Sequence, residues 1–261
     1  MSFAFRSVAV ALLALCSLAQ ARELRVCADP DNLPMSHADE SGFENRIARV
    51  VADEMGATLR YEWLQQVRGY VRKTLGEGLC DVFIGVPADF ERVLATRPYY
   101  RSTYVFVDGP RARGLESFDD PRIARLRIGV QLVGNDLAAT PPGHALARAG
   151  LVDNVRGFTL VGEGSAAERI GGALTRGEID AALVWGPQAG WLAARSSMPL
   201  EVHRASRPAD LGKIPFEFAI AMGVRRADTA LRDELDAILV KRRADIDAIL
   251  AAYSVPRTDA P

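Results

Sequence analysis

Residues 80–86 read Cys-Asp-Val-Phe-Ile-Gly-Val, and this run decides the fold class. Its apolar residues lack the polar alternation of a half-exposed strand, which is typical of a parallel strand buried on both faces. The segment before it, 68–75, is predicted to be a short helix that ends at Gly76 and Gly78. A helix that leads into a buried strand is the repeating unit of an α/β protein.

The residues before this unit continue the same alternation. Residues 24–28 are predicted to form a strand, 43–55 a helix with Ile47 and Val51 on its apolar face, and 58–64 a second strand. The order of elements up to residue 86 is therefore β-α-β-α-β. In a right-handed, doubly wound sheet, the first and third of these strands lie side by side.

The second half of the chain repeats this order. Three strands are predicted over 127–132, 157–161 and 180–185, and three helices over 142–149, 166–176 and 188–194. Two further strands, 104–107 and 217–224, lead out of the first half and back to it, and 229–252 is predicted to be one amphipathic helix. Two chain crossings between two α/β lobes predict a hinged cleft.

The expected architecture is an α/β protein with two lobes, each a doubly wound sheet flanked by helices. Lobe 1 is predicted to span 22–108, with 215–261 returning to it, and lobe 2 to span 109–214. The composition suits such a fold, since 49% of the residues are hydrophobic and 25% are charged. The formal net charge of −1 argues against binding to nucleic acid or to an anionic membrane, which need a basic field.

The first 21 residues are predicted to be a secretory signal peptide. Arg6 precedes an apolar stretch over 8–18, and the small residues in 19–21 predict cleavage after Ala21. The stretch has about 11 residues, whereas a membrane-spanning helix needs roughly 20. We therefore expect a periplasmic protein with no membrane insertion.

The cysteines predict one disulfide in the mature chain. Cys16 lies in the signal segment, and Leu15 stands before it where lipoprotein processing needs a small residue. The two that remain, Cys27 and Cys80, lie on the neighbouring first and third strands, within bridging distance. Two buried free thiols are the alternative. A metal pair is disfavoured because no other His or Cys stands near either residue at ligand spacing.

Several longer segments match a known superfamily. Residues 80–86, 91–92, 97–100 and 128–131 resemble the third strand, the following helix, the Pro-Tyr-Tyr passage and the opening strand of the second lobe in type II periplasmic solute-binding proteins. Six segments are similar to one branch of that superfamily, the quinoprotein-dehydrogenase-associated binding proteins of the MoxJ and XoxJ type. They are 24–30, 42–48, 97–107, 140–148, 184–187 and 221–226.

This resemblance implies a role beside a periplasmic PQQ-dependent alcohol dehydrogenase, typically a methanol dehydrogenase that uses calcium or a lanthanide. The chain would bind the enzyme and assist its maturation or activation. PQQ and the metal ion would belong to the partner enzyme, so we expect no cofactor and no metal to be bound to this chain.

Arg92 and Trp185 indicate which kind of ligand the cleft could bind. In amino-acid-binding relatives, an arginine at the position of Arg92 grips the ligand carboxylate. Its spacing to Pro98 is short for that role, and a solvated helical arginine is the alternative. Those relatives also place an acidic residue after an Asp-Ala run, but here 180–184 is followed by Trp185. This disfavours a free amino acid, because a buried ammonium without an anion costs several kcal/mol.

Nine residues are expected at the carboxyl ends of strands or at the hinge, where open α/β sheets bind their ligands. They are Asp29, Asn32, Arg68, Arg92, Tyr99, Tyr100, Asn135, Asp136 and Trp185. Aromatic and arginine side chains suit either a small ligand or an inserted segment of a partner protein. Two alternatives stay open, namely that Tyr99 and Tyr100 only pack the hinge and that Asp29 only caps a turn.

Signatures of an enzyme are few. His37, His144 and His203 occur without a His-x-x-x-His pair, and the sequence holds no Gly-x-Ser-x-Gly motif and no phosphate loop. The turn at 162–165 could hold an anion, but Ser165 is predicted to cap the helix that follows. The chain is therefore not expected to be an enzyme. The receptor of an ABC importer for a small organic solute is the main alternative, and a dehydratase on the same fold is a remote one.

Overall fold

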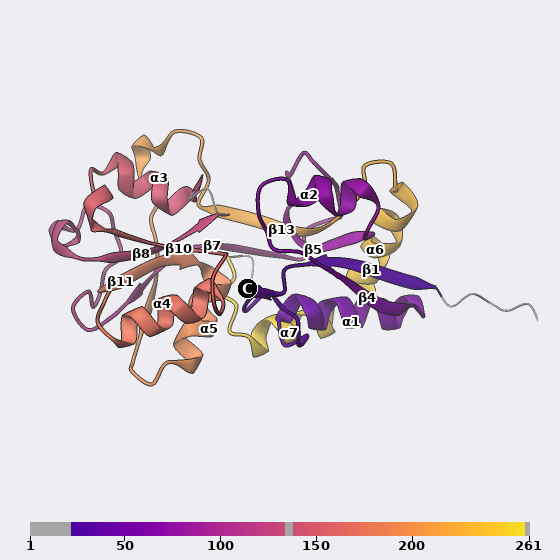
Figure 1. Cartoon of the computed structure of the whole chain (residues 1–261), viewed down its shortest axis with the longest axis horizontal. Helices are drawn as coiled ribbons and strands as arrows, with labels where there is room; N and C mark the ends of the chain where they lie inside the picture. The colour runs from indigo at the N-terminus through magenta and orange to yellow at the C-terminus, as the bar shows by residue number, and fades with distance from the viewer. Residues whose placement is uncertain (1–21, 134–137, 259–261) are drawn as a thin grey trace, which may run out of the picture.

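The computed structural model describes residues 22–133 and 138–258 and shows a two-lobed α/β molecule, as predicted (Figure 1). The predicted signal peptide, 1–21, lies outside the described residues. The strands are β1 (Glu23–Ala28), β2 (Asp31–Asn32), β3 (Ser36–His37), β4 (Thr58–Trp63), β5 (Val82–Pro87), β6 (Leu94–Ala95), β7 (Tyr100–Asp108), β8 (Ile128–Val133), β9 (Ala138–Ala139), β10 (Val155–Thr159), β11 (Ala181–Trp185), β12 (Glu201–Arg204) and β13 (Glu217–Val224). The helices are α1 (Phe43–Met55), α2 (Tyr70–Lys73), α3 (Pro141–Arg148), α4 (Ala166–Thr175), α5 (Gly186–Arg195), α6 (Thr229–Lys241) and α7 (Arg243–Ala252).

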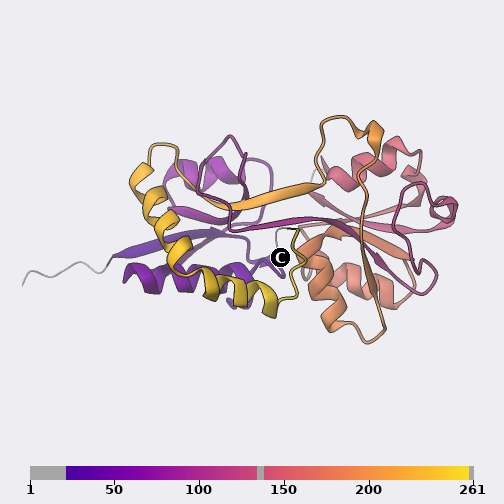
Figure 2. The ribbon, with the colours of Figure 1, turned by 180° about the vertical axis from the view of Figure 1, so that it is seen from behind.

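Strand β7 joins the two lobes into one sheet. Within the described residues, this sheet runs β10-β8-β11-β7-β13-β5-β1-β4, with β12 paired to β7, β6 to β13 and β9 to β8. Residues 100–103 of β7 pair antiparallel with β13, and residues 104–108 pair with β11 and β12. Figure 2 shows β7 and β13 running together from one lobe to the other. Because β7 belongs to both halves, the lobe limits drawn at residues 108 and 214 stay a prediction.

Each lobe is built on three parallel strands. In lobe 1, β1 lies between β4 and β5, and in lobe 2, β8 lies between β10 and β11. Helices α1, α4, α5 and α7 lie on one side of the sheet, and α2 and α3 lie on the other (Figure 1). Both faces of the parallel strands are therefore covered, which explains why residues 82–86 are apolar without alternation.

The predicted C-terminal helix is interrupted at Arg242, which separates α6 from α7. The prediction of one helix over 229–252 was therefore wrong in this detail. The two halves have different partners, since α6 packs on β13 and α7 packs on α1. One straight apolar stripe cannot face both, so the chain turns between them. Among the described residues, no helix is both long enough and apolar enough to span a membrane.

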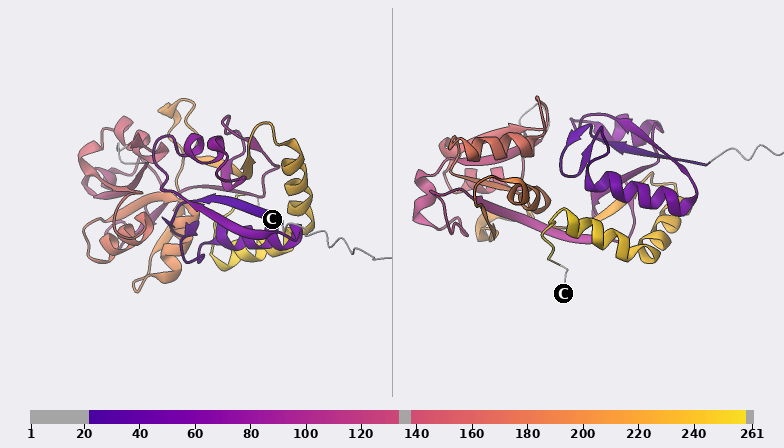
Figure 3. Two further views of the ribbon diagram at one scale, coloured as in Figure 1. Left: turned by 45° about the vertical axis from the view of Figure 1, so that its right-hand side comes forward. Right: turned by 90° about the horizontal axis from the view of Figure 1, so that it is seen from below.

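The segment after α7 returns to the junction between the lobes (Figure 3). The Ser102 hydroxyl of β7 donates a hydrogen bond to the Pro256 carbonyl at 2.6 Å, and the Thr258 N–H donates to the Arg101 carbonyl at 3.0 Å. On α5, a Cβ at Gly190 would collide with the Ser254 carbonyl. Residues 254–258 thus form a tail strap that holds α5 of lobe 2 against the hinge strand.

An identical arginine–aspartate clamp closes the base of each lobe. In lobe 1, Arg25 donates two hydrogen bonds to Asp81, at 3.1 and 2.7 Å, and one to the Gly78 carbonyl at 2.9 Å. In lobe 2, Arg127 contacts Asp180 at 3.0 and 2.8 Å, and its NH2 donates to the Gly177 carbonyl at 2.6 Å. Both glycines have a positive φ, of 73° and 64°, which favours glycine there. The repeated order of elements therefore extends to individual side chains.

The predicted disulfide between Cys27 and Cys80 is confirmed. Its Cα atoms lie 5.5 Å apart, within the range that a disulfide spans. Val26 of β1 is in register with Val82 of β5, so the two cysteines are neighbours because their strands are. The bond closes a loop of 53 residues inside lobe 1 and does not link the lobes.

We predict that Asp180→Asn lowers the free energy of unfolding by about 1–3 kcal/mol, because it leaves the bonds from Arg127 without an anionic acceptor. Hydrogen bonding from Arg127 lowers the pKa of Asp180, so this stabilisation is present above the ordinary carboxyl pKa of 3.8 and is lost as the pH falls below it. Urea unfolding at pH 7 and pH 3 measures both effects. Glu178→Gln is the matched control, since its exposed pair with Arg176 should change stability little. Equal effects of the two variants would contradict the prediction.

Candidate functional site

A cavity of about 360 Å³ lies between the lobes, at the carboxyl ends of the parallel strands. In lobe 1, the segments that follow β1 and β4 bring Asn32 and Gln66 to it, and the end of β5 brings Pro87. In lobe 2, β8 and β11 bring Gln131 and Trp185. The full lining is Asn32, Met35, Gln66, Pro87, Tyr104, Gln131, Val133, Thr140, Leu183, Val184, Trp185, Gln188, Phe218 and Ile220. This is the edge at which open α/β sheets bind ligands.

Among the residues that the structure describes, every side chain that lines this cavity is uncharged. Its polar groups are four amides, the hydroxyls of Tyr104 and Thr140, and the indole N–H of Trp185. On the lobe 2 wall, the Gln188 amide donates a hydrogen bond to the Gln131 side chain, and the Thr140 hydroxyl donates to the Gln131 carbonyl at 2.9 Å. Groups of this kind can both donate to and accept from a peptide, but they cannot neutralise a charged ligand.

Asp29 supports the lobe 1 wall of the cavity through hydrogen bonds to the backbone. Its side chain is buried, with Oδ1 accepting from the Asp31 N–H at 2.9 Å and Oδ2 from the Gln66 N–H at 2.7 Å. Burial raises the pKa of Asp29, and the two backbone hydrogen bonds oppose that rise. Asp29 therefore caps a turn and holds in place the segments that carry Asn32 and Gln66, but it is not itself part of the lining.

Three aromatic rings from three strands form the apolar wall. Trp185 of β11 lies 5.3 Å from Tyr104 of β7 and 5.7 Å from Phe218 of β13, centroid to centroid, in edge-to-face arrangements. The cross-strand register places Trp185 directly opposite Tyr104. Trp185 also hydrogen-bonds to the hydroxyl of Tyr100, which lies in the core. Such rigid aromatic groups are the side chains that most often anchor a protein interface.

The nine expected site residues fall into four groups. Asn32 and Trp185 line the cavity, and Asp29 supports its wall. Tyr99 and Tyr100 are buried at the hinge, where the Tyr99 hydroxyl donates to the Ile84 carbonyl at 3.1 Å and Tyr100 packs on Phe43. Their packing corresponds to the alternative left open in the sequence.

Of the remaining four residues, the structure describes only Arg68 and Arg92. Arg68 and Arg92 are exposed and are not among the residues that line it. Arg92 lies in a turn before β6, and no helix forms there. Asn135 and Asp136 lie outside the described residues.

Sequence reasoning missed most of the polar lining. The missed lining residues are Gln66, Gln131 and Gln188, which are polar, and Tyr104, which adds an aromatic ring. Gln131 ends a predicted strand and Gln188 follows Trp185 by three residues, so strand-end position was a usable signal. The turn at 162–165 behaves as predicted, since the Ser165 hydroxyl accepts from the Glu168 N–H at 3.2 Å and caps α4.

Glu44 places an unpaired carboxyl near this site. It lies in the first turn of α1, its N–H donates to the carbonyl of Met35 at 2.9 Å, and its carboxyl leaves no room for a Cβ on Gly85. Burial raises the pKa of Glu44 to about 7. This contact explains why residue 85 of the buried strand β5 is a glycine.

No protein-family model matches the chain. The protein MoxJ of Methylorubrum extorquens is 34% identical to it, over 97% of this chain and 93% of the relative. The protein MoxJ of Paracoccus denitrificans is 33% identical, over 94% of each chain. The chain belongs to the MoxJ family. The resemblance inferred from the sequence is thereby confirmed.

Solved structures agree with this membership of the MoxJ family. The periplasmic binding protein XoxJ from Methylobacterium extorquens is 37% identical and superposes with a TM-score of 0.73, over 91% of this chain and all of that one. MxaJ from Methlophaga aminisulfidivorans is 25% identical with a TM-score of 0.76, over 90% and 99%. An ancestral cationic amino acid solute-binding protein, at 20% identity and a TM-score of 0.67, shares the fold.

The raised pKa of Glu44 predicts a pH-dependent stability. The folded chain disfavours the ionised carboxyl, so stability is fully present below the ordinary pKa of 4.5 and falls as the pH rises through about 7. Between pH 5 and pH 8 the loss from this group is on the order of 1–3 kcal/mol. Glu44→Gln should flatten that decline in urea unfolding, while Glu77→Gln, at an exposed carboxyl, should not. A wild-type slope in Glu44→Gln would exclude this origin.

Proposed function

We propose that this chain is a periplasmic accessory protein that binds a PQQ-dependent alcohol dehydrogenase, such as a methanol dehydrogenase, and assists its maturation or activation. Export to the periplasm is part of the proposal and rests on the predicted signal peptide and on the periplasmic relative XoxJ. The observation that carries the proposal is the uncharged, aromatic and amide-rich lining of the cavity.

That lining suits a polypeptide segment better than a charged small molecule. A free amino acid brings an ammonium and a carboxylate, and each would enter the cavity without a counter-charge, at a cost of several kcal/mol. The same argument applies to a carboxylate-rich cofactor such as PQQ. A peptide segment instead presents uncharged N–H and C=O groups, which the amides of Asn32, Gln66, Gln131 and Gln188 can satisfy.

The aromatic wall supplies the apolar part of such an interface. Trp185 is only partly buried, while Tyr104 and Phe218 hold its ring from two sides. A side chain that is held in this way loses little rotamer freedom on binding, which favours affinity. Trp185 is therefore the proposed anchor for a segment of the dehydrogenase.

Trp185→Ala should weaken association with the purified dehydrogenase by about 1–3 kcal/mol, which is roughly 5- to 150-fold in the dissociation constant. Titration calorimetry measures it, and far-UV circular dichroism should show an intact fold. Trp63→Ala is the matched control, because Trp63 is also partly buried and stacks on Tyr61 at 4.5 Å but does not line the cavity.

Arg92→Ala belongs in the same titration, since a contribution of Arg92 to the interface remains a prediction. If Trp185→Ala bound as tightly as wild type, the interface would lie outside the cavity. A deletion strain that assembled fully active, cofactor-loaded dehydrogenase would argue against the accessory role itself.

A solute receptor of an ABC importer is the second candidate, because the cavity has the position and size of a small-molecule site. In that case a neutral organic solute should bind, and a ligand at 100 times its dissociation constant should add about 2.7 kcal/mol of stability. A thermal-shift screen of amino acids, organic acids, neutral solutes and PQQ tests this function. No shift across the screen would count against it. The remote dehydratase hypothesis gains no support from the described part of the lining, which includes no carboxylate for acid–base chemistry.

A further inference from the structure

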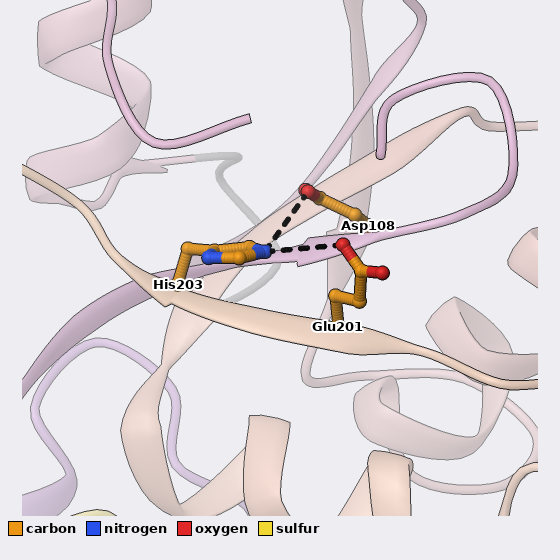
Figure 4. Close-up of side chains that lie close together, drawn as sticks. All are labelled: Asp108, Glu201 and His203. Atoms are coloured by element: carbon orange, nitrogen blue, oxygen red, sulfur yellow. Dashed lines mark hydrogen bonds and ion pairs between the residues drawn. The ribbon is translucent and has the colours of Figure 1, made fainter. Parts of the chain in front are cut away.

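Lobe 2 carries a second cluster of ionisable side chains, away from the cavity. Asp108, Glu201 and His203 each offer one ligand atom, and these atoms lie within 4.8 Å of one another (Figure 4). None of the three residues is among those that line the cavity, so this cluster is separate from the proposed function. No metal was expected on this chain, because the resemblance assigns the metal ion to the partner enzyme and the sequence holds no His-x-x-x-His pair. The groups of this cluster come from two strands, β7 and β12.

Strand geometry brings the three groups together. Successive side chains on a strand point to opposite faces, so Glu201 and His203 of β12 share one face. In the antiparallel register, Glu201 stands directly opposite Asp108 of β7. The alternate residues Val107 and Val202 take the other face. The cluster is therefore fixed by backbone pairing and does not depend on flexible loops.

The distances suit tetrahedral coordination. The Nε2 atom of His203 lies 3.4 Å from Glu201 Oε2 and 3.6 Å from Asp108 Oδ2. With metal–ligand bonds of about 2.0–2.2 Å, the ligand atoms of a tetrahedral zinc site lie about 3.3–3.6 Å apart. An ion would fit between these atoms with small movements of the side chains.

A neighbouring carboxylate supports the correct tautomer of His203. Glu116 Oε1 lies 3.2 Å from Nδ1 of the ring. An Nδ1–H that donates to Glu116 leaves the lone pair on Nε2, which faces Asp108 and Glu201. A carboxylate behind a ligating histidine is the usual supporting arrangement in metal sites. Arg113 contacts Glu201 Oε1 at 3.1 Å, which leaves Oε2 for an ion.

The Asp108 side chain is fully buried and lacks a sufficient counter-charge. Its Oδ2 accepts from the Leu115 N–H at 2.7 Å, while Oδ1 has no hydrogen-bond partner among the described residues. Figure 4 shows the carboxylate directed at His203. A buried carboxylate with one unpartnered oxygen is costly, and a cation bound to this carboxylate would neutralise its charge and offset that cost.

We propose that Asp108, Glu201 and His203 bind one divalent transition-metal ion, with Zn²⁺ as the fitting example, and that Glu116 positions the histidine ring. One imidazole nitrogen and two carboxylate oxygens are a ligand set that zinc accepts, with a water molecule in the fourth position. Their two negative charges balance those of the ion. The bound ion would tie the edge strand β12 and the loop that carries Glu116 to β7.

Zinc binding to tag-free mature protein tests the proposal, after treatment with EDTA and dialysis into metal-free buffer. Titration calorimetry with ZnCl₂ should give one site per chain, and Co²⁺ should give the visible absorption of a tetrahedral site. His203→Gln should abolish stoichiometric binding. Glu116→Ala should weaken it by about 10- to 100-fold, as loss of a supporting carboxylate does elsewhere.

His37→Gln is the matched control, because His37 pairs at 2.7 Å with the single carboxylate of Asp39. This variant should bind zinc as wild type does. Circular dichroism in EDTA shows whether His203→Gln is folded. Binding that survives His203→Gln, that is lost in His37→Gln, or that is absent from the wild-type protein would overturn the proposal.

Discussion

The molecule depends on the backbone pairing of β7. This one strand pairs with β13 at its first residues and with β11 and β12 at its last, so a single run of hydrogen bonds joins both lobes. Tyr104 stands where the pairing changes from lobe 1 to lobe 2, and its cross-strand neighbour is Trp185. The aromatic wall of the cavity and the metal cluster at Asp108 are both positioned by the register of this strand.

Charged and uncharged side chains have different roles around the cavity. Asp29 lies behind the cavity wall and accepts hydrogen bonds from the backbone of two loops, while the arginine–aspartate clamps at Asp81 and Asp180 close the opposite ends of the lobes. The surface of the cavity itself carries amides and rings. Uncharged groups can bind an extended backbone without a large cost of desolvation. The uncharged lining therefore favours a segment of a protein as the ligand.

Much of the fold was predictable because its signals are local. Helix α1 runs from Phe43 to Met55 as predicted, since its apolar face is periodic and Gly56 ends it with a left-handed φ of 60°. Strand β13 also has its predicted bounds, Glu217–Val224. The interruption at Arg242 was not predictable, because it depends on which elements α6 and α7 pack against. Strand β12 was not predicted, because its four residues are too few to show the alternation of polar and apolar side chains that marks a strand.

The candidate site was harder to predict than the fold. Trp185 and Asn32 were found because they follow strand ends. The three glutamines were missed because glutamine is common on surfaces, and only the tertiary structure brings Gln131 against Gln188. The expectation that Arg92 binds a ligand carboxylate came from relatives whose corresponding arginine lies on a helix. In this chain Arg92 lies in an exposed turn. The metal cluster was not predicted because Asp108 stands 93 and 95 positions before Glu201 and His203 and meets them only through strand register.

The tail strap bears on the kinetics of recognition. Proteins of this architecture commonly open and close about two crossing strands, and a guest then binds only after a domain movement. In this chain a third segment, held by Ser102 and Arg101 and packed against Gly190, adds contacts that opening would have to break. The free protein should therefore keep its cavity close to its final shape. A preformed cavity reduces the entropy lost on binding, so a guest can associate without waiting for the lobes to close.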